Sequence, residues 1–476
     1  MRGSRVVLPA ATAAAIAIAL GSSAVAPSRA EAAPDYAAAA TSARKLLGEL
    51  IAADTTNPPG NEARAVAIGV ERLKAAGIHY RVSTFAEGRQ NLVARLKGDG
   101  SAKPVLMIAH IDVVGAEGQD WSTKPHELTE KDGFLYGRGT GDDLGMAAVE
   151  LEVLELLKKQ KVPLARDVIL AWTGDEESGG AGVRWILEHE PKTIEAEVVL
   201  NEGGGLVLGK DGKPVRVDLQ TAEKTYQDFV LISRGPTGHS SVPLPENAIY
   251  QLARALGRIA ERSFPARTLP VTRANFAARA DLEGGETGKA MRAVAEAPGG
   301  PPAMARAVLD RDPTLAANLR TTCVATLIEG GTRVNALPAE ARATINCRIL
   351  PDETPKDVRA ELEKIIDDPG IEIEMSDEFG FGEPSPLEGP GPKAIAKVVE
   401  EMWPGLPIVP FMSRGATDSR FLRAKGMAAY GIEPIGTTEE DERRAHGVDE
   451  RIPANQLKPA IEFLYRLVVE LAAKKS

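Results

Sequence analysis

Cysteine is scarce in this sequence. The 476 residues contain only Cys323 and Cys347. Two cysteines are too few for a disulfide-stapled scaffold or for a zinc site built from thiolates. Any metal ion bound by this chain is therefore held by histidine and carboxylate side chains.

Clustered positive charge is also missing. The chain carries 57 Lys and Arg against 67 Asp and Glu, a net charge of −10, and no basic block interrupts this balance. Proteins that bind nucleic acids contact phosphates through clustered lysine and arginine. The composition therefore predicts no nucleic-acid partner. The length exceeds that of one ordinary core and indicates two domains, or one domain with a large insertion.

After the N-terminal region, no apolar run is long enough to span a bilayer. Two arginines in the first five residues precede an alanine-rich apolar run over 6–25, and small residues recur between 28 and 33. This order is typical of a secretory signal peptide. A membrane anchor is the alternative, but Gly and Ser at 21–23 break the run. We predict a signal peptide over 1–33, a periplasmic or secreted location, and no membrane association after its removal.

Beyond the signal peptide, strand and helix patterns alternate. Apolar runs at 105–109 and 168–173 are separated by a helical pattern at 143–159. Such alternation predicts an α/β fold with helices on a sheet. Between 224 and 350 the pattern changes to strands of an antiparallel sheet with helices between them. We therefore predict an inserted α+β domain there, with a catalytic domain formed by 34–223 and 351–476.

Histidine and acidic residues gather where the predicted strands end. His110 and Asp112 follow the first strand, 175–177 follow the second, and Glu202 follows a third at 198–200. One acidic strand end is equally typical of a helix N-cap or a surface turn. Several at one sheet edge repel one another unless a cation neutralises them. His with Asp and Glu is a zinc ligand set, and two ions can share a bridging carboxylate.

These motifs and several others occur in the order found in one enzyme family. The sequence resembles the M20 family of metallopeptidases and aminoacylases over nearly the whole mature chain. The motifs that carry the resemblance are Thr55-Thr56-Asn57-Pro58-Pro59-Gly60, His110-Ile111-Asp112, Gly137-Arg138-Gly139-Thr140-Gly141-Asp142, Asp175-Glu176-Glu177, Asn201-Glu202-Gly203, Gly238-His239-Ser240-Ser241, Gly330-Gly331-Thr332-Arg333-Val334-Asn335, Gly415-Ala416-Thr417-Asp418 and His446-Gly447.

The resemblance implies a fold and a metal content. The fold is a zinc-dependent exopeptidase-type catalytic domain, a mixed sheet flanked by helices, with an inserted ferredoxin-like lid or dimerisation domain. The cofactor is two Zn²⁺, with Co²⁺ or Mn²⁺ as possible substitutes. His110 and Glu202 would bind one ion, Glu177 and His446 the other, and Asp142 would bridge both.

The resemblance also implies catalytic roles next to the metal ligands. Glu176 would take a proton from a metal-bridging water and deliver it to the leaving nitrogen. Asp112 would orient His110. The peptide bond after Asp142 is often cis in the family.

In the lid, the resemblance implies residues that reach the substrate. His239 would stabilise the oxyanion in the partner's active site of a homodimer formed through the lid. Asn335 and Arg348 would bind the substrate, with Arg348 pairing to its free carboxylate. A plain turn histidine and a structural salt bridge are the alternatives for His239 and Arg348.

The predicted reaction is hydrolysis of an amide bond next to a free carboxylate, in small peptides or N-acyl amino acids. A biosynthetic-type deacylase, such as an acetylornithine deacetylase, is the alternative among enzymes. A zinc-dependent binding protein that has lost catalysis is the alternative of another class. The presence of the base Glu176 argues against that last reading.

The two cysteines allow a separate prediction. Asn335 lies midway between Cys323 and Cys347. If the flanking strands form a hairpin around this loop, the cysteines face each other at a distance that permits a bond. We therefore predict a disulfide in the lid.

Overall fold

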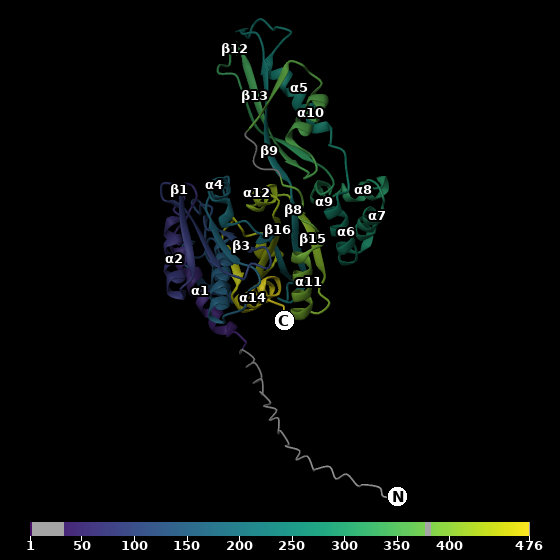
Figure 1. Ribbon diagram of the computed structural model, residues 1–476. Coiled ribbons are helices and arrows are strands. Elements are labelled where there is room, and N and C mark those ends of the chain that lie inside the picture. Colours follow the sequence, from purple (N-terminus) through teal and green to yellow (C-terminus); the bar gives the residue numbers. More distant parts are fainter. Residues whose placement is uncertain (2–32, 377–381, 476) are drawn as a thin grey trace. The chain divides into compact units, whose positions relative to one another are not determined.

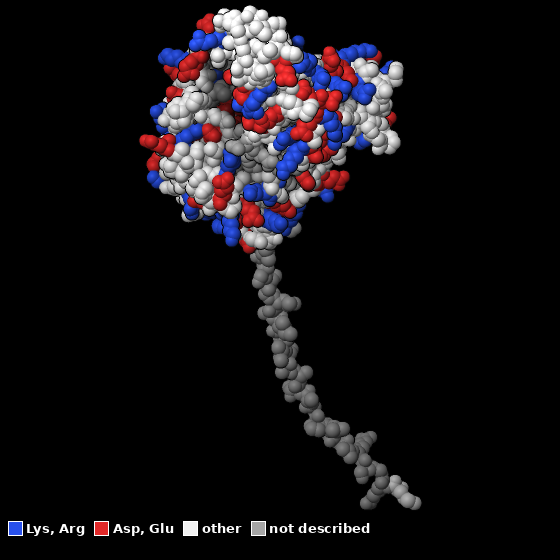
Figure 2. Space-filling model, turned by 90° about the horizontal axis from the view of Figure 1, so that it is seen from above, with Lys and Arg blue, Asp and Glu red and all other residues white. Residues whose placement is uncertain are grey.

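The computed structural model describes residues 1, 33–376 and 382–475. The predicted signal peptide thus lies almost entirely outside the described residues. Within them, no helix combines the length and the apolar character needed to cross a membrane. Figure 2 shows lysine and arginine intermixed with aspartate and glutamate on the face viewed, without a continuous basic field.

An eight-stranded mixed sheet forms the first layer of the fold. Its central strands run parallel, while β1, β2 and β8 introduce antiparallel pairs. This confirms the predicted α/β class with a mixed sheet. In spatial order the strands are β1 (His79–Ala86), β2 (Arg89–Leu96), β6 (Val168–Thr173), β3 (Val105–His110), β7 (Val198–Leu208), β16 (Ala428–Thr438), β8 (Pro214–Glu223) and β15 (Ile408–Ser413).

Helices cover both faces of this sheet, as Figure 1 shows. In β3, Val105 and Met107 face one core, and Leu106 and Ile108 face the other. All four are fully buried, as expected for a parallel strand with both faces covered. The first core contains α1 (Tyr36–Ala52), α2 (Ala63–Ala76), α3 (Leu144–Lys159), α11 (Pro390–Met402) and α14 (Leu457–Ala472), and the second contains α4 (Ala181–His189) and α12 (Ser419–Ala424).

A second, four-stranded antiparallel sheet forms the lid. Its strands lie in the order β11-β13-β9-β14. The chain order β-α-β-β-α-β and this strand order give the ferredoxin-like arrangement that the resemblance implied. The elements are β9 (Thr225–Arg234), α5 (Ala248–Glu261), β11 (Thr322–Gly330), β13 (Glu340–Ile349), α10 (Pro355–Ile366) and β14 (Ile371–Met375).

The strand pairing extends the lid beyond the domain boundary that we predicted at residue 350. β14 pairs with β9 through Ile371↔Ser233 and Ile373↔Leu231, and α10 shares the lid's hydrophobic core. A boundary at 350 therefore cuts the ferredoxin-like sheet. A helix followed by a strand occurs in both layers, so the sequence pattern after Pro355 did not distinguish them.

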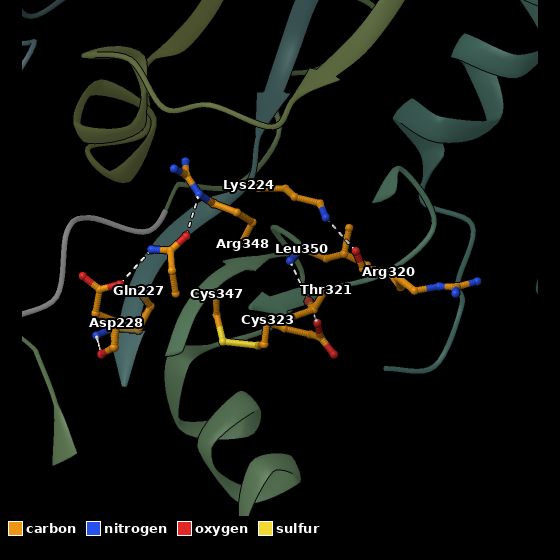
Figure 3. Close-up of a disulfide and its surroundings, with 11 residues drawn as sticks. Lys224, Gln227, Asp228, Arg320, Thr321, Cys323, Cys347, Arg348 and Leu350 are labelled. Carbon is orange, nitrogen blue, oxygen red and sulfur yellow. Dashed lines mark hydrogen bonds between the residues drawn. A yellow bond between two sulfur atoms is a disulfide. The ribbon is translucent and has the colours of Figure 1, made fainter. Parts of the chain in front are cut away.

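A disulfide joins the two cysteines of the lid, which confirms that prediction. Cys323 and Cys347 are directly opposed in the β11–β13 ladder, with their Cα atoms 4.1 Å apart. Figure 3 shows the bond beside the junction where β9, β11 and β13 meet the rest of the chain. Cys347 is fully buried in the lid core, so the bond fixes the edge strand β11 to the centre of the sheet.

Four helices inserted between α5 and β11 cover an edge of the catalytic sheet. They have their own small hydrophobic core. The Asn275 amide donates to the Pro410 carbonyl of β15 over 2.9 Å. The group thus shields an edge strand, which otherwise exposes unpaired backbone groups. The helices are α6 (Pro270–Glu283), α7 (Gly285–Glu296), α8 (Ala303–Leu309) and α9 (Pro313–Ala317).

Short elements complete the fold and bring distant segments together. A three-stranded sheet of β4 (Thr129–Lys131), β5 (Phe134–Tyr136) and β17 (Arg451–Pro453) places the segment after His446 beside the glycine-rich turn at 137–141. A two-stranded ladder of β10 (Gly238–His239) and β12 (Ala336–Leu337) joins two lid loops. The helix α13 (Glu439–Glu442) precedes His446.

Candidate metal centre

Strand order places the predicted ligands at one region of the sheet. His110 is the last residue of β3 and pairs in register with Thr173, the last residue of β6. Glu176 and Glu177 follow directly in the turn after β6, and Glu202 lies on the neighbouring strand β7. Parallel strands therefore deliver these side chains to the carboxyl edge, where open α/β sheets bind ligands.

Asp142 lies between two histidines. Its Oδ1 is 2.9 Å from Nε2 of His110, and its Oδ2 is 3.0 Å from Nε2 of His446. The peptide bond between Asp142 and Asp143 is cis, as the resemblance implied. One carboxylate thus faces a different imidazole with each oxygen, which is the arrangement of a bridging ligand.

Among the described residues, two groups of side chains are close enough to hold a cation. His110, Glu176 and Glu202 form one group, and His110, Asp142 and Glu177 form the other, each with ligand atoms within 4.8 Å of one another. Nε2 of His446 is also 3.0 Å from Oε2 of Glu177. The other Glu177 oxygen, Oε1, is buried without a hydrogen-bond partner. This orphaned oxygen and the mixed His and carboxylate donors fit a divalent metal.

The charge balance of the group also fits a cation. Burial disfavours the imidazolium of His110, yet the nearby carboxylates of Asp112 and Asp142 raise its pKa well above the usual value. Hydrogen bonds to Asp142 and Glu177 raise the pKa of His446 to about 10. Burial, and then the charge of Glu176, raises the pKa of Glu202. The clustered carboxylates therefore stabilise positive charge at this site, and bound metal ions can supply that charge.

Asp112 supports the turn that carries the glutamates more directly than it supports His110. Its carboxylate accepts the backbone N–H groups of Glu176 and Glu177 over 3.2 and 3.3 Å. Nδ1 of His110 is 3.0 Å from the Asp112 main-chain oxygen but 3.7 Å from its carboxylate. The orienting contact on His110 is thus the carbonyl, while the carboxylate fixes Glu176 and Glu177.

Asn57 extends this support. Its side-chain amide donates to Asp112 over 2.8 Å and to Asp175 over 3.2 Å. Asp175 also accepts from Arg89 over 2.7 Å. The sequence around Asn57 does not predict this role, because only the fold brings a residue 55 positions away onto Asp112.

A buried ion pair fixes Asp142 relative to the His446 segment. Nη1 of Arg138 is 2.6 Å from Oε2 of Glu450, and both side chains are almost fully buried. The other Glu450 oxygen accepts from the backbone N–H of Gly141 and of Asp142. Arg138 also donates to the Gly447 carbonyl. The local sequence predicts no role for either partner, although both lie close to a predicted ligand along the chain.

Glu176 is half-buried in an acidic environment. Burial raises its pKa well above the usual value, and Asp418 adds to that rise. Asp418 is itself buried and accepts from the Thr173 hydroxyl over 2.7 Å. The loop that carries Asp418 therefore closes over the end of β6 beside Glu176.

The predicted lid residues are placed differently. His239 and Asn335 are exposed, and Nδ1 of His239 is 2.8 Å from the Ser241 hydroxyl. The main-chain oxygens of His239 and Asn335 accept from the backbone N–H groups of Val242 and Ser240. Arg348 is half-buried on β13 and reaches the Arg414 carbonyl over 3.3 Å. The structure thus brings together the five predicted ligands with Asp112 and Glu176, but in the described part of the chain no hydrogen bond or ion pair joins His239 or Asn335 to them.

The sequence profile of peptidase family M20/M25/M40 matches residues 106–470, which include all these ligands. The chain belongs to this family. It is therefore a hydrolase of the M20 group, whose metallopeptidases bind metal ions.

Curated M20 relatives cover most of the chain. The human N-fatty-acyl-amino acid synthase/hydrolase PM20D1 is 29% identical over 78% of this chain and 74% of its own length. A probable carboxypeptidase S-like 2 of Dictyostelium discoideum is 30% identical over 82% of this chain and 76% of its own. Among solved structures, the M20 family metallo-carboxypeptidase Sso-CP2 from Sulfolobus solfataricus matches with a TM-score of 0.68 at 19% identity, covering 90% of this chain and 98% of that one. This last likeness confirms the fold.

Proposed function

We propose that this chain is an exported two-zinc hydrolase. It cleaves the amide bond next to a free carboxylate in small peptides or N-acyl amino acids. The observation that carries the proposal is Asp142, whose two oxygens face His110 and His446 at 2.9 and 3.0 Å. A carboxylate shared in this way suits two cations side by side.

Five side chains would hold the ions. His110 and Glu202 would bind one, Glu177 and His446 the other, and Asp142 both. Zinc in such a site polarises the substrate carbonyl and makes water acidic enough to ionise near neutral pH. Co²⁺ or Mn²⁺ would be substitutes, since the donors are nitrogen and oxygen only.

Glu176 would be the general base and then the general acid. Its carboxylate would take a proton from the attacking water and pass it to the leaving nitrogen. The raised pKa that burial gives Glu176 suits this exchange, because a more basic carboxylate holds the proton until the nitrogen accepts it. Asp112 would keep the base in place through the backbone N–H of Glu176.

The substrate class rests on Arg348 and on the relatives. The Arg348 guanidinium lies on the Tyr226 ring at 4.7 Å and would pair with the substrate carboxylate, while Asn335 would bind from its lid loop. The names of the relatives refer to N-fatty-acyl amino acids and to carboxypeptidase activity. A biosynthetic-type deacylase is the second candidate, because a probable succinyl-diaminopimelate desuccinylase of Staphylococcus aureus is 27% identical over 68% of this chain.

A homodimer through the lid would complete the site. On the edge strand β11, Val324, Leu327 and Ile328 are 62 to 65% exposed. An apolar, unpaired strand edge favours pairing with a second copy. His239 would then stabilise the oxyanion in the partner's site. We assign the lid body to 225–375 by strand pairing, with the catalytic domain on either side.

The proposal is tested by comparing substrates that differ only at the carboxyl terminus. The protein without 1–33 is loaded with zinc and given matched dipeptides and N-acyl amino acids with free or amidated termini. We expect kcat/KM to be about 10- to 100-fold higher on the free acids, the range for one charged hydrogen-bonded contact. Chelation should abolish both activities. Equal rates on acids and amides would remove the proposed role of Arg348.

A further inference from the structure

The two histidines of the proposed metal centre are held in different ways. His110 is the last residue of β3, and its side chain is only 1% exposed. His446 lies in a turn after α13, and its side chain is 55% exposed. Packing therefore holds the first imidazole closely and the second only weakly. The position of His446 thus depends strongly on the contacts that its main chain makes.

The turn that carries His446 has an uncommon backbone conformation. We call residues 446–449 the His446 turn. His446 and Asp449 have φ angles of 63° and 55°, in the left-handed region that residues other than glycine seldom adopt. Such a conformation persists where the surrounding structure holds it. The His446 turn therefore needs support from other parts of the chain.

A loop from a distant part of the sequence supplies this support. The loop over 114–122 comes shortly after β3. The side-chain amide of Gln119 donates to the main-chain oxygen of His446 over 3.0 Å. The backbone N–H of Ser122 donates to Oδ1 of Asp449 over 2.8 Å. The loop thus bonds both residues of the His446 turn that have a left-handed backbone, in each case across 327 positions of the sequence.

Gln119 is itself fixed by two donors. Its Oε1 accepts from Nε1 of Trp121 over 2.8 Å and from Nη2 of Arg138 over 3.0 Å. Because the amide oxygen is occupied in this way, the amide NH₂ group is the end that faces the His446 carbonyl. The same nitrogen of Arg138 also donates to the Gly447 carbonyl over 3.2 Å. Two successive carbonyls of the His446 turn are therefore held by one hydrogen-bonded group.

This support concerns only one of the two proposed ions. His110 and Glu202 lie on the neighbouring strands β3 and β7, so the sheet positions the ligands of the first ion without the His446 turn. Resting on the proposed two-zinc function, we infer that Gln119 is a positioning residue for His446 and sets the affinity of the second ion. It acts through the backbone of His446. The first ion thus binds to ligands fixed by the sheet, and the second binds where the 114–122 loop holds His446 in place.

The test measures the affinities of the two ions separately. The metal-free protein is titrated with Zn²⁺ by calorimetry and with Co²⁺ by absorption spectroscopy. Gln119→Met keeps the length of the side chain but removes the amide. We expect the Kd of the second ion to rise about 10- to 100-fold, the usual effect of losing a hydrogen bond that supports a metal ligand, while the Kd of the first stays unchanged. A merely structural role would weaken both ions alike.

Two further variants make the result specific. Gln160→Met replaces a half-buried glutamine at the C-terminal end of α3, the end far from Asp143, and should change neither Kd. Trp121→Phe keeps an aromatic ring but removes the N–H that donates to Gln119. It should raise the Kd of the second ion by a smaller factor than Gln119→Met, and it takes the place of that variant if Gln119→Met does not fold.

The outcomes separate this inference from the proposed function. Two ions in every variant, with only the second weakened by Gln119→Met, would support the inference. An unchanged Kd of the second ion in the folded variant, or an equal loss at both ions, overturns it. One ion per chain in the unmodified protein would instead overturn the two-zinc proposal, and the inference with it.

Discussion

The metal-side cluster consists of the five proposed ligands, and the lid tip is the loop around His239. These two regions differ in how much of each a single chain provides. At the metal side, Asp142 is within 3.0 Å of two imidazoles, and Arg138 with Glu450 fixes the backbone on which it sits. At the lid tip, His239 is exposed, and its imidazole lies 2.8 Å from the hydroxyl of Ser241 in the same turn. The metal-side cluster is thus preorganised within a single fold. The proposed role of His239 depends on lid position or on a second chain.

The supporting structure of the two regions differs in the same way. The turn that carries Glu176 is held by Asp112, which is fully buried and accepts a hydrogen bond from Asn57. The lid edge β11 exposes Leu327 and Ile328 to solvent. Burial excludes water from the first region, whereas the second presents apolar surface that favours a partner.

The largest effect should follow removal of the base from the preorganised side. Glu176→Gln keeps the size of the side chain but cannot take a proton, so kcat should fall by about 10²- to 10⁴-fold. Zinc content, measured by elemental analysis, should remain at the level of the unmodified protein. Full turnover by this variant would show that another group is the base.

The next effect should come from the lid tip. His239→Ala should lower kcat by about 10²- to 10³-fold if the imidazole stabilises the oxyanion. Mixing and reassociating His239→Ala chains with Glu176→Gln chains should then restore activity, to about a quarter of that of the unmodified dimer. In such a hybrid, the chain with an intact base receives His239 from its partner. No recovery on mixing would place His239 in its own chain's site or outside catalysis.

A smaller effect should follow loss of the support beneath Asp112. Asn57→Ala removes the amide that Asp112 and Asp175 share, and should weaken metal affinity or activity by about 10- to 100-fold. A Co²⁺-loaded sample reports the change through its absorption spectrum. Asn455→Ala, on an exposed asparagine, is the matched control. Unchanged affinity and unchanged kcat for Asn57→Ala would show that the metal side does not need this contact.

The smallest catalytic effect should come from opening the lid disulfide. Cys323→Ser/Cys347→Ser should lower the free energy of unfolding of the lid by about 3 kcal/mol, since the bond closes a loop with a sequence separation of 24. Hydrogen exchange should rise in β11 and β13 while β3 and β6 stay protected. Two titratable thiols in the unmodified protein, under denaturing and non-reducing conditions, would contradict the bond itself.

The sequence predicted the preorganised side better than the lid. His110, Glu177 and Glu202 follow apolar strands, and strand ends meet at one edge whatever the details of packing. Opposed cysteines around one hairpin likewise follow from local geometry. Such features depend on periodicity and on short separations along the chain, which a single sequence contains.

The remaining features depend on contacts between distant segments. Arg138 and Glu450 are 312 positions apart in the sequence. Neither local sequence pattern predicts that the two side chains form an ion pair. The segment after Pro355 has the helix–strand pattern of both layers, so only strand pairing assigns β14 to the lid. The carboxylate of Asp112 turned out to bond the backbone of Glu176 and Glu177, because the turn after β6 folds back onto it.

The central claim is that Asp142 joins two metal ions within a single chain. Elemental analysis and calorimetric titration of the metal-free protein with Zn²⁺ test it most directly. The account predicts two ions per chain in the unmodified protein, and loss of the pair in Asp142→Asn, which keeps the shape but removes the bridging charge. A saturating stoichiometry of one ion per chain, unaffected in its affinity by Asp142→Asn, would contradict it.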